Sequence, residues 1–212
     1  RDAVSQLEEA IRLSPDDARL HVLLAEKQLA MGHAELARQT ANHAIDLEPT
    51  LADAWAVRGR VLRASGRLRQ ALADSHRALG LAPADQTIQY EIAELHYELN
   101  QPRRALAALQ SLADTYPSGE EPQHVLYLQG LAHSALRRWD DAVESLSEAS
   151  VRGRPSAEIF SELGRAELSA GRPREAAVAV REALLLDPDH VPSRALAEEL
   201  QLASDLDPLV RR

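Results

Sequence analysis

Small and apolar residues recur along this chain with a fixed period of 34 residues. One of the clearest copies of the pattern runs Leu163-Gly164, Ala176, Val180, Ala183 and Pro188. A period of this length is typical of stacked repeat proteins, in which each unit buries its apolar face only against its neighbours. The pattern therefore predicts a single array over residues 1–212 instead of a closed globular domain.

The repeats share one register, which defines five full units. They run over residues 18–51, 52–85, 86–119, 123–156 and 157–190, with three extra residues between the third and the fourth. In every unit, position 8 is Ala or Gly and position 20 is Ala. Small side chains at fixed places indicate that two helices approach each other closely there.

Proline and glycine mark the helix ends within each unit. Position 32 is Pro in four of the five units, and Pro at that place ends the second helix. Position 15 is Gly in three units and Asn100 in another, as expected for a left-handed residue after the first helix. Arg137 is the exception at this position. Each unit is therefore predicted to be a helix, a tight turn and a second helix.

The first residues of the chain match the second half of a repeat. Within residues 1–17, the matching positions are Ala3, Leu7, Ala10 and Pro15. Because the chain has no initiating Met and starts inside a repeat, we expect it to be an excised or processed piece.

The last residues are predicted to close the array. Residues 191–204 are assigned to an amphipathic capping helix, with Leu196, Leu200 and Leu202 available to cover the exposed end. Residues 205–212 are left as a tail.

These positions resemble the tetratricopeptide repeat (TPR) family, whose motif has small residues at 8 and 20 and Pro at 32. The chain departs from that motif because position 24 has no aromatic residue, position 7 includes Arg58 and Gln129, and position 11 includes Gln28 and His96. The resemblance implies an all-α, right-handed superhelical solenoid of helix-turn-helix repeats. It also implies a non-enzymatic protein–protein interaction scaffold.

In TPR folds, positions 2, 5, 9 and 12 of each first helix line a concave groove, and we call the side chains at these positions the groove stripe. The candidate partner-binding residues on or beside the most distinctive part of the stripe are Arg60, Arg63, Tyr90, Glu94, Tyr97, His124, Tyr127 and Leu131. Three of the four tyrosines of the chain fall on the stripe. Tyrosine favours interfaces because it supplies contact area with little loss of entropy.

Two interpretations of these residues stay open. In the first, the tyrosines take apolar side chains of a bound peptide and the arginines take a carboxylate. In the second, Tyr97 compensates for His96, which occupies the position where the family usually has a tyrosine. Arg60 and Arg63 are then simply solvated. The residues with which some TPR proteins grip the carboxylates of chaperone tails are absent from any three consecutive repeats.

Composition narrows the choice of partner. Apolar residues make up 45% of the chain but aromatic residues only 3%, which suits an all-helical array built from Ala and Leu. The net charge of -9 argues against nucleic acid as a partner, because phosphate binding needs clustered basic residues. No apolar run approaches the ~18 residues of a membrane span. The expected ligand is a protein or a peptide.

The sequence predicts no catalytic, metal or cofactor site. Cysteine is absent, and no nucleophile elbow, phosphate loop or zinc-protease motif occurs. His96 and His133 share position 11 in neighbouring repeats, but two imidazoles without a further ligand are more often structural.

Two alternative functions remain at this point. The segment is either a regulatory or substrate-presenting arm of a larger enzyme, or a spacer that self-associates through Ala3, Leu7 and Ala10. The use of Arg in place of Lys and the absence of Cys are compatible with a bacterial cytoplasm or periplasm, and do not choose between them.

Overall fold

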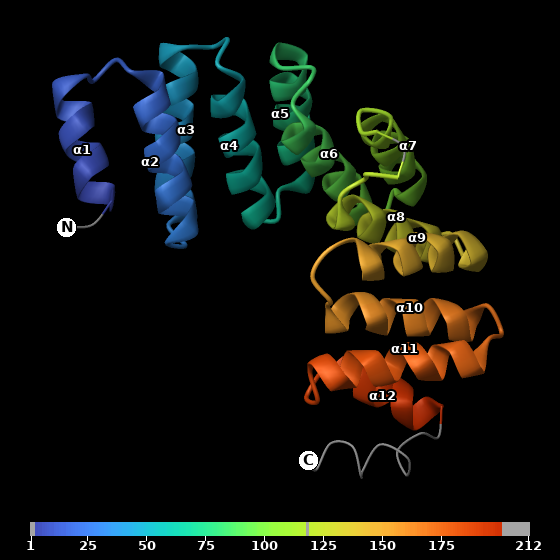
Figure 1. Cartoon of the computed structure of the whole chain (residues 1–212). Helices are drawn as coiled ribbons and strands as arrows, with labels where there is room; N and C mark the ends of the chain where they lie inside the picture. The colour runs from blue at the N-terminus through green and yellow to red at the C-terminus, as the bar shows by residue number, and fades with distance from the viewer. Residues whose placement is uncertain (1–2, 118, 201–212) are drawn as a thin grey trace. The chain divides into compact units, whose positions relative to one another are not determined.

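The computed structural model describes residues 3–117 and 119–200, and twelve α-helices with no strand make up the regular structure of this part. The chain divides into two compact units, Arg1–Gln101 and Pro102–Arg212, which are described one at a time. The unit boundary falls between the two helices of the third repeat (Figure 1).

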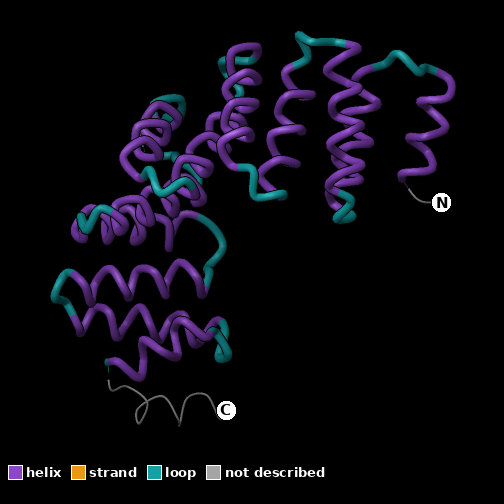
Figure 2. The backbone as a smooth tube through the Cα atoms, turned by 180° about the vertical axis from the view of Figure 1, so that it is seen from behind, coloured by secondary structure: helices purple, strands orange, loops and turns teal. Residues whose placement is uncertain are grey.

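Unit 1 holds six helices. They are α1 (Ala3–Leu13), α2 (Ala18–Ala30), α3 (Ala34–Leu47), α4 (Ala52–Ala64), α5 (Leu68–Leu81) and α6 (Gln86–Glu98). Each helix packs on the next one along the chain, and α2 also packs on α4, the first helix of the following repeat. Figure 2 shows the short loops that alternate between the two ends of the helices.

Unit 2 also holds six helices. They are α7 (Pro102–Ala113), α8 (Gln123–Ala135), α9 (Trp139–Arg152), α10 (Ala157–Ser169), α11 (Pro173–Leu186) and α12 (Val191–Glu199). Helix α10 lies at the centre of the packing, because it contacts α8, α9, α11 and α12.

The helix boundaries follow the sequence pattern. The first helix of every full repeat begins at the residue that the repeat register predicts, from Ala18 to Ala157. Pro102 and Pro173 are the first residues of α7 and α11, where their missing N–H leaves no hydrogen bond unmade. Arg137 has φ 58, close to the φ 56 of Asn100 and within the left-handed region occupied by Gly at the same place in the other repeats.

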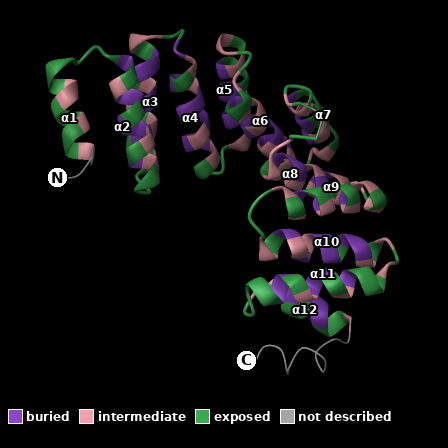
Figure 3. Cartoon of the chain, viewed as in Figure 1, coloured by how far each residue is buried: buried purple, intermediate pink, exposed green. Residues whose placement is uncertain are grey.

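The core is a series of small clusters between successive helices (Figure 3). At position 24, where the family pattern has an aromatic residue, Leu109, Leu146 and Val180 have no exposed surface. A side chain on Gly130 would bring its Cβ to 2.5 Å from Leu146 Cγ, so glycine is required for this close approach of α8 and α9. Aliphatic residues packed against small ones therefore replace the aromatic residue of the pattern.

The exception at position 7 of the second repeat has its own structural solution. Arg58 on α4 makes two hydrogen bonds to the Asp74 carboxylate on α5, at 2.7 Å and 2.8 Å, and a third to Asn42 Oδ1 on α3 at 3.0 Å. Its guanidinium carbon lies 4.7 Å from the centre of the Trp55 ring. A charged contact thus connects three helices at a position where three of the other four repeats have an aliphatic residue.

The capping helix begins at Val191, the first residue of the predicted 191–204 segment, and Pro192 fits in its first turn. Leu196 is 4% exposed and packs with Val180 and Leu184, as expected for a residue that covers the last repeat. Leu200 is partly buried against the same cluster. Leu202 and the 205–212 tail lie outside the described residues.

Candidate functional site

In unit 1, the groove stripe comes from α2, α4 and α6. Of its position-5 residues, Val22 and Ala56 are 6% and 4% exposed, so only Tyr90 is open to a ligand at this position. The other candidates of this unit, Arg60, Arg63, Glu94 and Tyr97, are all half-buried.

Arg60 connects the first helices of three successive repeats. Its Nη2 donates to Glu26 Oε1 of the preceding repeat at 2.9 Å, and its Nε lies 3.6 Å from Glu91 Oε1 of the following repeat. Both contacts run across the stripe, so the guanidinium is held between two carboxylates of the chain itself.

Arg63 is also held between two carboxylates, both on α6. Its Nη1 donates to Glu94 Oε2 at 2.7 Å, and its Nη2 to Glu98 Oε1 at 2.5 Å. Burial opposes the charge on Arg63, but the hydrogen bonds and charges of Glu94 and Glu98 outweigh it, so the pKa of Arg63 is raised. The interpretation that these arginines are merely solvated is therefore wrong.

We call this set of six side chains the ion ladder of unit 1. Its members are Glu26, Arg60, Arg63, Glu91, Glu94 and Glu98. Four carboxylates surround two guanidiniums, which makes this part of the stripe acidic in balance. Glu91 and Glu98 are not stripe positions, and the sequence prediction missed them.

Burial shifts the pKa of one residue beside the ladder and of one member of it. The pKa of Tyr90 is raised to about 12 by burial and by the charge of Glu94, with Arg63 opposing. Burial also raises the pKa of the Glu91 carboxyl, and the nearby charge of Arg60 only partly offsets it. Glu91 Oε2 is buried and has no hydrogen-bond partner among the described residues.

In unit 2, the candidate residues lie on α8. His124 is exposed, whereas Tyr127 and Leu131 are half-buried. The Tyr127 hydroxyl lies 3.4 Å from Glu158 Oε1 on α10, and the other oxygen of that carboxylate lies 3.0 Å from His190 Nε2 at the start of α12. A chain of polar contacts thus connects α8, α10 and α12, and the sequence prediction missed its His190 end.

Sequence models of one family match almost the whole chain. Two models described as "Tetratricopeptide repeat" match, one over residues 1–61 and 62–129 and the other over residues 127–191. The chain belongs to the tetratricopeptide repeat family. No curated protein matches the chain by sequence.

Solved TPR structures have the same fold. A crystal structure of YrrB, described as "a TPR protein with an unusual peptide-binding site", has a TM-score of 0.73 at 18% identity and covers 92% of this chain and 100% of its own. PilF of Pseudomonas aeruginosa has a TM-score of 0.79 at 16% identity over 93% of this chain and 88% of its own. MamA of Desulfovibrio magneticus RS-1, residues 41 to the end, has a TM-score of 0.74 at 19% identity over 83% of this chain and 98% of its own.

The TPR fold is that of a protein–protein interaction scaffold, and TPR repeats are generally non-enzymatic. Within the described part of this TPR chain, no cluster of His, Cys, Asp or Glu is arranged to hold a metal ion. His96 Nδ1 instead lies 3.1 Å from Gln101 Oε1. None of the described helices is long and apolar enough to span a membrane.

Two cavities in unit 1 lie away from the groove stripe of this TPR chain. One of about 400 Å³ is lined by residues of α3, α4 and α5 that include Arg38, Arg58 and Arg67. The other, of about 520 Å³, is lined by residues 66–70 and Leu99. None of the lining residues of either cavity is a candidate from the sequence.

Proposed function

We propose that the chain is a protein-interaction scaffold whose groove stripe binds an extended segment of a partner protein, without catalysis of its own. The observation that supports the proposal best is the pairing of half-buried tyrosines with the ion ladder in unit 1. Tyr90 and Tyr97 lie two turns apart on α6, on the same helix as Glu91, Glu94 and Glu98. Peptide-binding surfaces often combine aromatic side chains with charged groups held in fixed positions.

The ion ladder favours a particular ligand chemistry. A carboxylate of a ligand would have to displace Glu26, Glu94 or Glu98 from an arginine that already has two partners. A lysine or arginine of a ligand would instead meet an excess of carboxylates, and it would also gain from the faces of the tyrosine rings. We therefore propose a ligand segment that combines basic and apolar side chains, in place of the carboxylate-bearing ligand considered from sequence.

Within unit 2, the stripe offers a surface of its own that suits apolar side chains of a partner protein. Tyr127 packs with the buried residues of two clusters and is fixed further by its contact with Glu158. Leu131 lies one turn later on the same helix. A fixed aromatic ring next to an aliphatic side chain offers contact area at little cost in side-chain entropy.

The test is a selection of peptides from a random library on the whole chain, followed by fluorescence anisotropy with the selected peptides. We expect these peptides to contain Lys or Arg together with apolar residues. The variant Tyr90→Ala, Tyr97→Ala should weaken their binding at least about tenfold, as expected for the loss of aromatic contact residues.

Tyr116 provides the matched control, because it is the one tyrosine that is not on the stripe. Tyr116→Ala should leave the affinity within about twofold, given that an exchange outside an interface costs little. Selected peptides rich in Asp and Glu, or equal losses in both variants, would contradict the proposal.

A further inference from the structure

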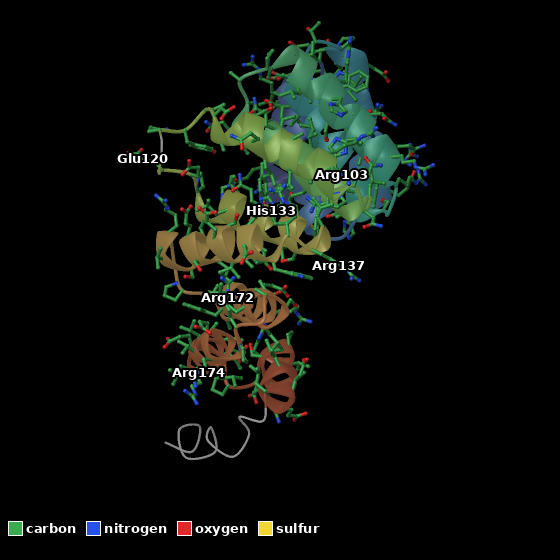
Figure 4. All side chains as sticks on the ribbon, turned by 90° about the vertical axis from the view of Figure 1, so that its right-hand side faces the viewer. Arg103, Glu120, His133, Arg137, Arg172 and Arg174 are labelled. Atoms are coloured by element: carbon green, nitrogen blue, oxygen red, sulfur yellow. The ribbon has the colours of Figure 1, made fainter. Side chains whose placement is uncertain are left out.

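A second surface stands out at the ends of the helices in unit 2. We call it the arginine edge, and it consists of the exposed or half-buried Arg103, Arg137, Arg138, Arg172 and Arg174. These residues lie where the first helix of a repeat turns into the second, or in the first turn of the second helix. Figure 4 views unit 2 from this side and labels four of the five.

Successive repeats are joined along this edge. Arg172 Nη2 lies 3.3 Å from Asp140 Oδ1, which places the turn after α10 beside the first turn of α9. Arg172 Nε also lies 2.5 Å from Glu167 Oε2, and Arg138 Nε lies 2.6 Å from Asp141 Oδ2. Arg172 therefore connects two repeats, and Arg138 is paired with a carboxylate of its own repeat.

The other three arginines are not used in this way. Within residues 3–117 and 119–200, Arg103, Arg137 and Arg174 have no ion-pair partner, and all three are exposed. Arg67, Arg69 and Arg154 are also exposed without an ion pair in the described residues, but they do not lie on this edge of unit 2. The arginine edge is thus a local positive surface on an acidic protein.

Arg137 adds an observation of a different kind. It occupies the left-handed position with φ 58, where three other repeats have Gly. A side chain in this region costs about 1–2 kcal/mol relative to glycine. The left-handed backbone closes the end of α8, which glycine would do without this cost, and the Arg137 side chain has no ion pair in the described part of the chain that would offset it.

The charges at the opposite ends of the helices differ. There two of the turns carry Glu120, Glu121, Asp187 and Asp189, whereas the turn between α9 and α10 carries Arg154 next to Arg152. Figure 4 shows Glu120 at the far end of the helices from Arg137. The opposite edge is therefore mixed in charge, and an acidic ligand is favoured more at the arginine edge.

We propose that the arginine edge is a second interaction surface, which binds an acidic segment of a partner protein through the guanidiniums of Arg103, Arg137 and Arg174. Arginine forks pair with carboxylates in a planar, two-pronged geometry. A nucleic acid fits less well, because Asp140 and Asp141 interrupt the positive surface and the whole chain repels a polyphosphate. The proposal does not rest on the function of the groove stripe.

The test uses the whole chain and a fluorescent peptide of Glu and Ser residues, about 12 residues and therefore about 40 Å long when extended. We expect binding that weakens as salt is added, because exposed charge pairs are screened. The variant Arg103→Gln, Arg137→Gln, Arg174→Gln should lose about tenfold or more in affinity, as expected for three charge-assisted contacts.

The control variant makes the same change of charge at other places in unit 2. It is Arg152→Gln, Arg154→Gln, Arg194→Gln, and it should keep the affinity within about twofold. Equal losses in the two variants would overturn the proposal, and so would the absence of peptide binding at low salt. Tighter binding of a single-stranded DNA of equal charge would assign the edge to nucleic acid and overturn it as well.

Arg137→Gly is a second variant that cannot fail through misfolding of the turn, because three of the other four repeats have glycine at this position. We expect a higher unfolding temperature together with a lower affinity for the acidic peptide. The variant Tyr90→Ala, Tyr97→Ala should bind that peptide as the wild type does, so the two proposed surfaces can fail or succeed separately. If Arg137→Gly kept full affinity, this residue would have no part in the site and the proposal would be overturned.

Discussion

The ion ladder of unit 1 and the arginine edge of unit 2 use the same residue type in opposite ways. In the ladder, Arg60 and Arg63 are each held between two glutamates, and three repeats are joined by these contacts. On the edge, Arg103, Arg137 and Arg174 are exposed and lack ion-pair partners in the described part of the chain. The comparison shows that neighbouring carboxylates make an arginine a connector between repeats, and that an exposed arginine without such neighbours keeps its charge available to a ligand.

A third kind of arginine contact is the Arg58–Asp74 pair inside unit 1. Its removal is expected to have the largest effect on stability. The side chain of Asp74 is only 10% exposed and that of Arg58 is 23% exposed. Asp74→Ala would leave a mostly buried guanidinium without its carboxylate, and we expect a loss of about 3 kcal/mol in the free energy of unfolding. Urea unfolding followed by circular dichroism measures it.

The control for this change removes both charges. The double variant Arg58→Leu, Asp74→Ala should regain most of the lost stability, because a well-packed apolar residue often replaces a buried ion pair at no cost. A loss of less than about 0.5 kcal/mol in the single variant, the usual size of a surface exchange, would show that the pair does not connect the helices.

Removing a connector of the ladder should have a smaller effect. Arg63→Gln breaks two ion pairs and leaves Glu94 and Glu98 facing each other, and we expect a loss of about 1.5 kcal/mol that shrinks at high salt. The matched change on the edge is Arg174→Gln, which should alter stability by less than about 0.5 kcal/mol. Equal effects of the two changes on the urea midpoint would remove the distinction between connector and ligand-binding arginines.

Most of the fold follows from the sequence because its signals are local and repeated. Gly or Pro at fixed places ends a helix whatever lies around it, and each first helix begins at the residue that the register predicts. The capping helix likewise begins at Val191, the first residue of the predicted 191–204 segment, with Pro192 in its first turn.

The candidate site could be predicted from the sequence only in part. The sequence indicates which side chains share the stripe, because that depends on helical spacing alone. It does not indicate that Glu91 and Glu98 reach across to Arg60 and Arg63, because those contacts depend on how neighbouring repeats are packed. A signal does exist, since charges of opposite sign recur 31 to 35 residues apart, one repeat away.

The strained backbone of Arg137 allows a test of the arginine edge, the second surface in the comparison. Replacing Arg137 by glycine should raise the free energy of unfolding by about 1 kcal/mol, because it removes the strain of a side chain at φ 58. The reverse change, Gly171→Arg, should lower it by a similar amount at the equivalent place. If Arg137→Gly lowered the stability instead, the side chain would have a structural role and the edge would resemble the ladder.

The smallest expected effect concerns the protonation of Glu91, whose pKa is raised mainly by burial. A raised pKa means that ionisation costs more in the folded chain than in the unfolded one, so stability is lost as the pH rises from about 4.3, the usual pKa of Glu, through the raised value. Glu91→Gln should therefore stabilise the chain slightly at pH 7 and have no effect below about pH 4.

Glu98→Gln is the contrasting variant. Because Glu98 forms an ion pair with Arg63, removing its charge should destabilise the chain at pH 7. Urea midpoints of both variants between about pH 3.5 and 7, which spans the titration of a carboxyl group, separate the two cases. A destabilising Glu91→Gln at pH 7 would show instead that the ion pair of Glu91 with Arg60 contributes more to stability than burial of the carboxylate costs.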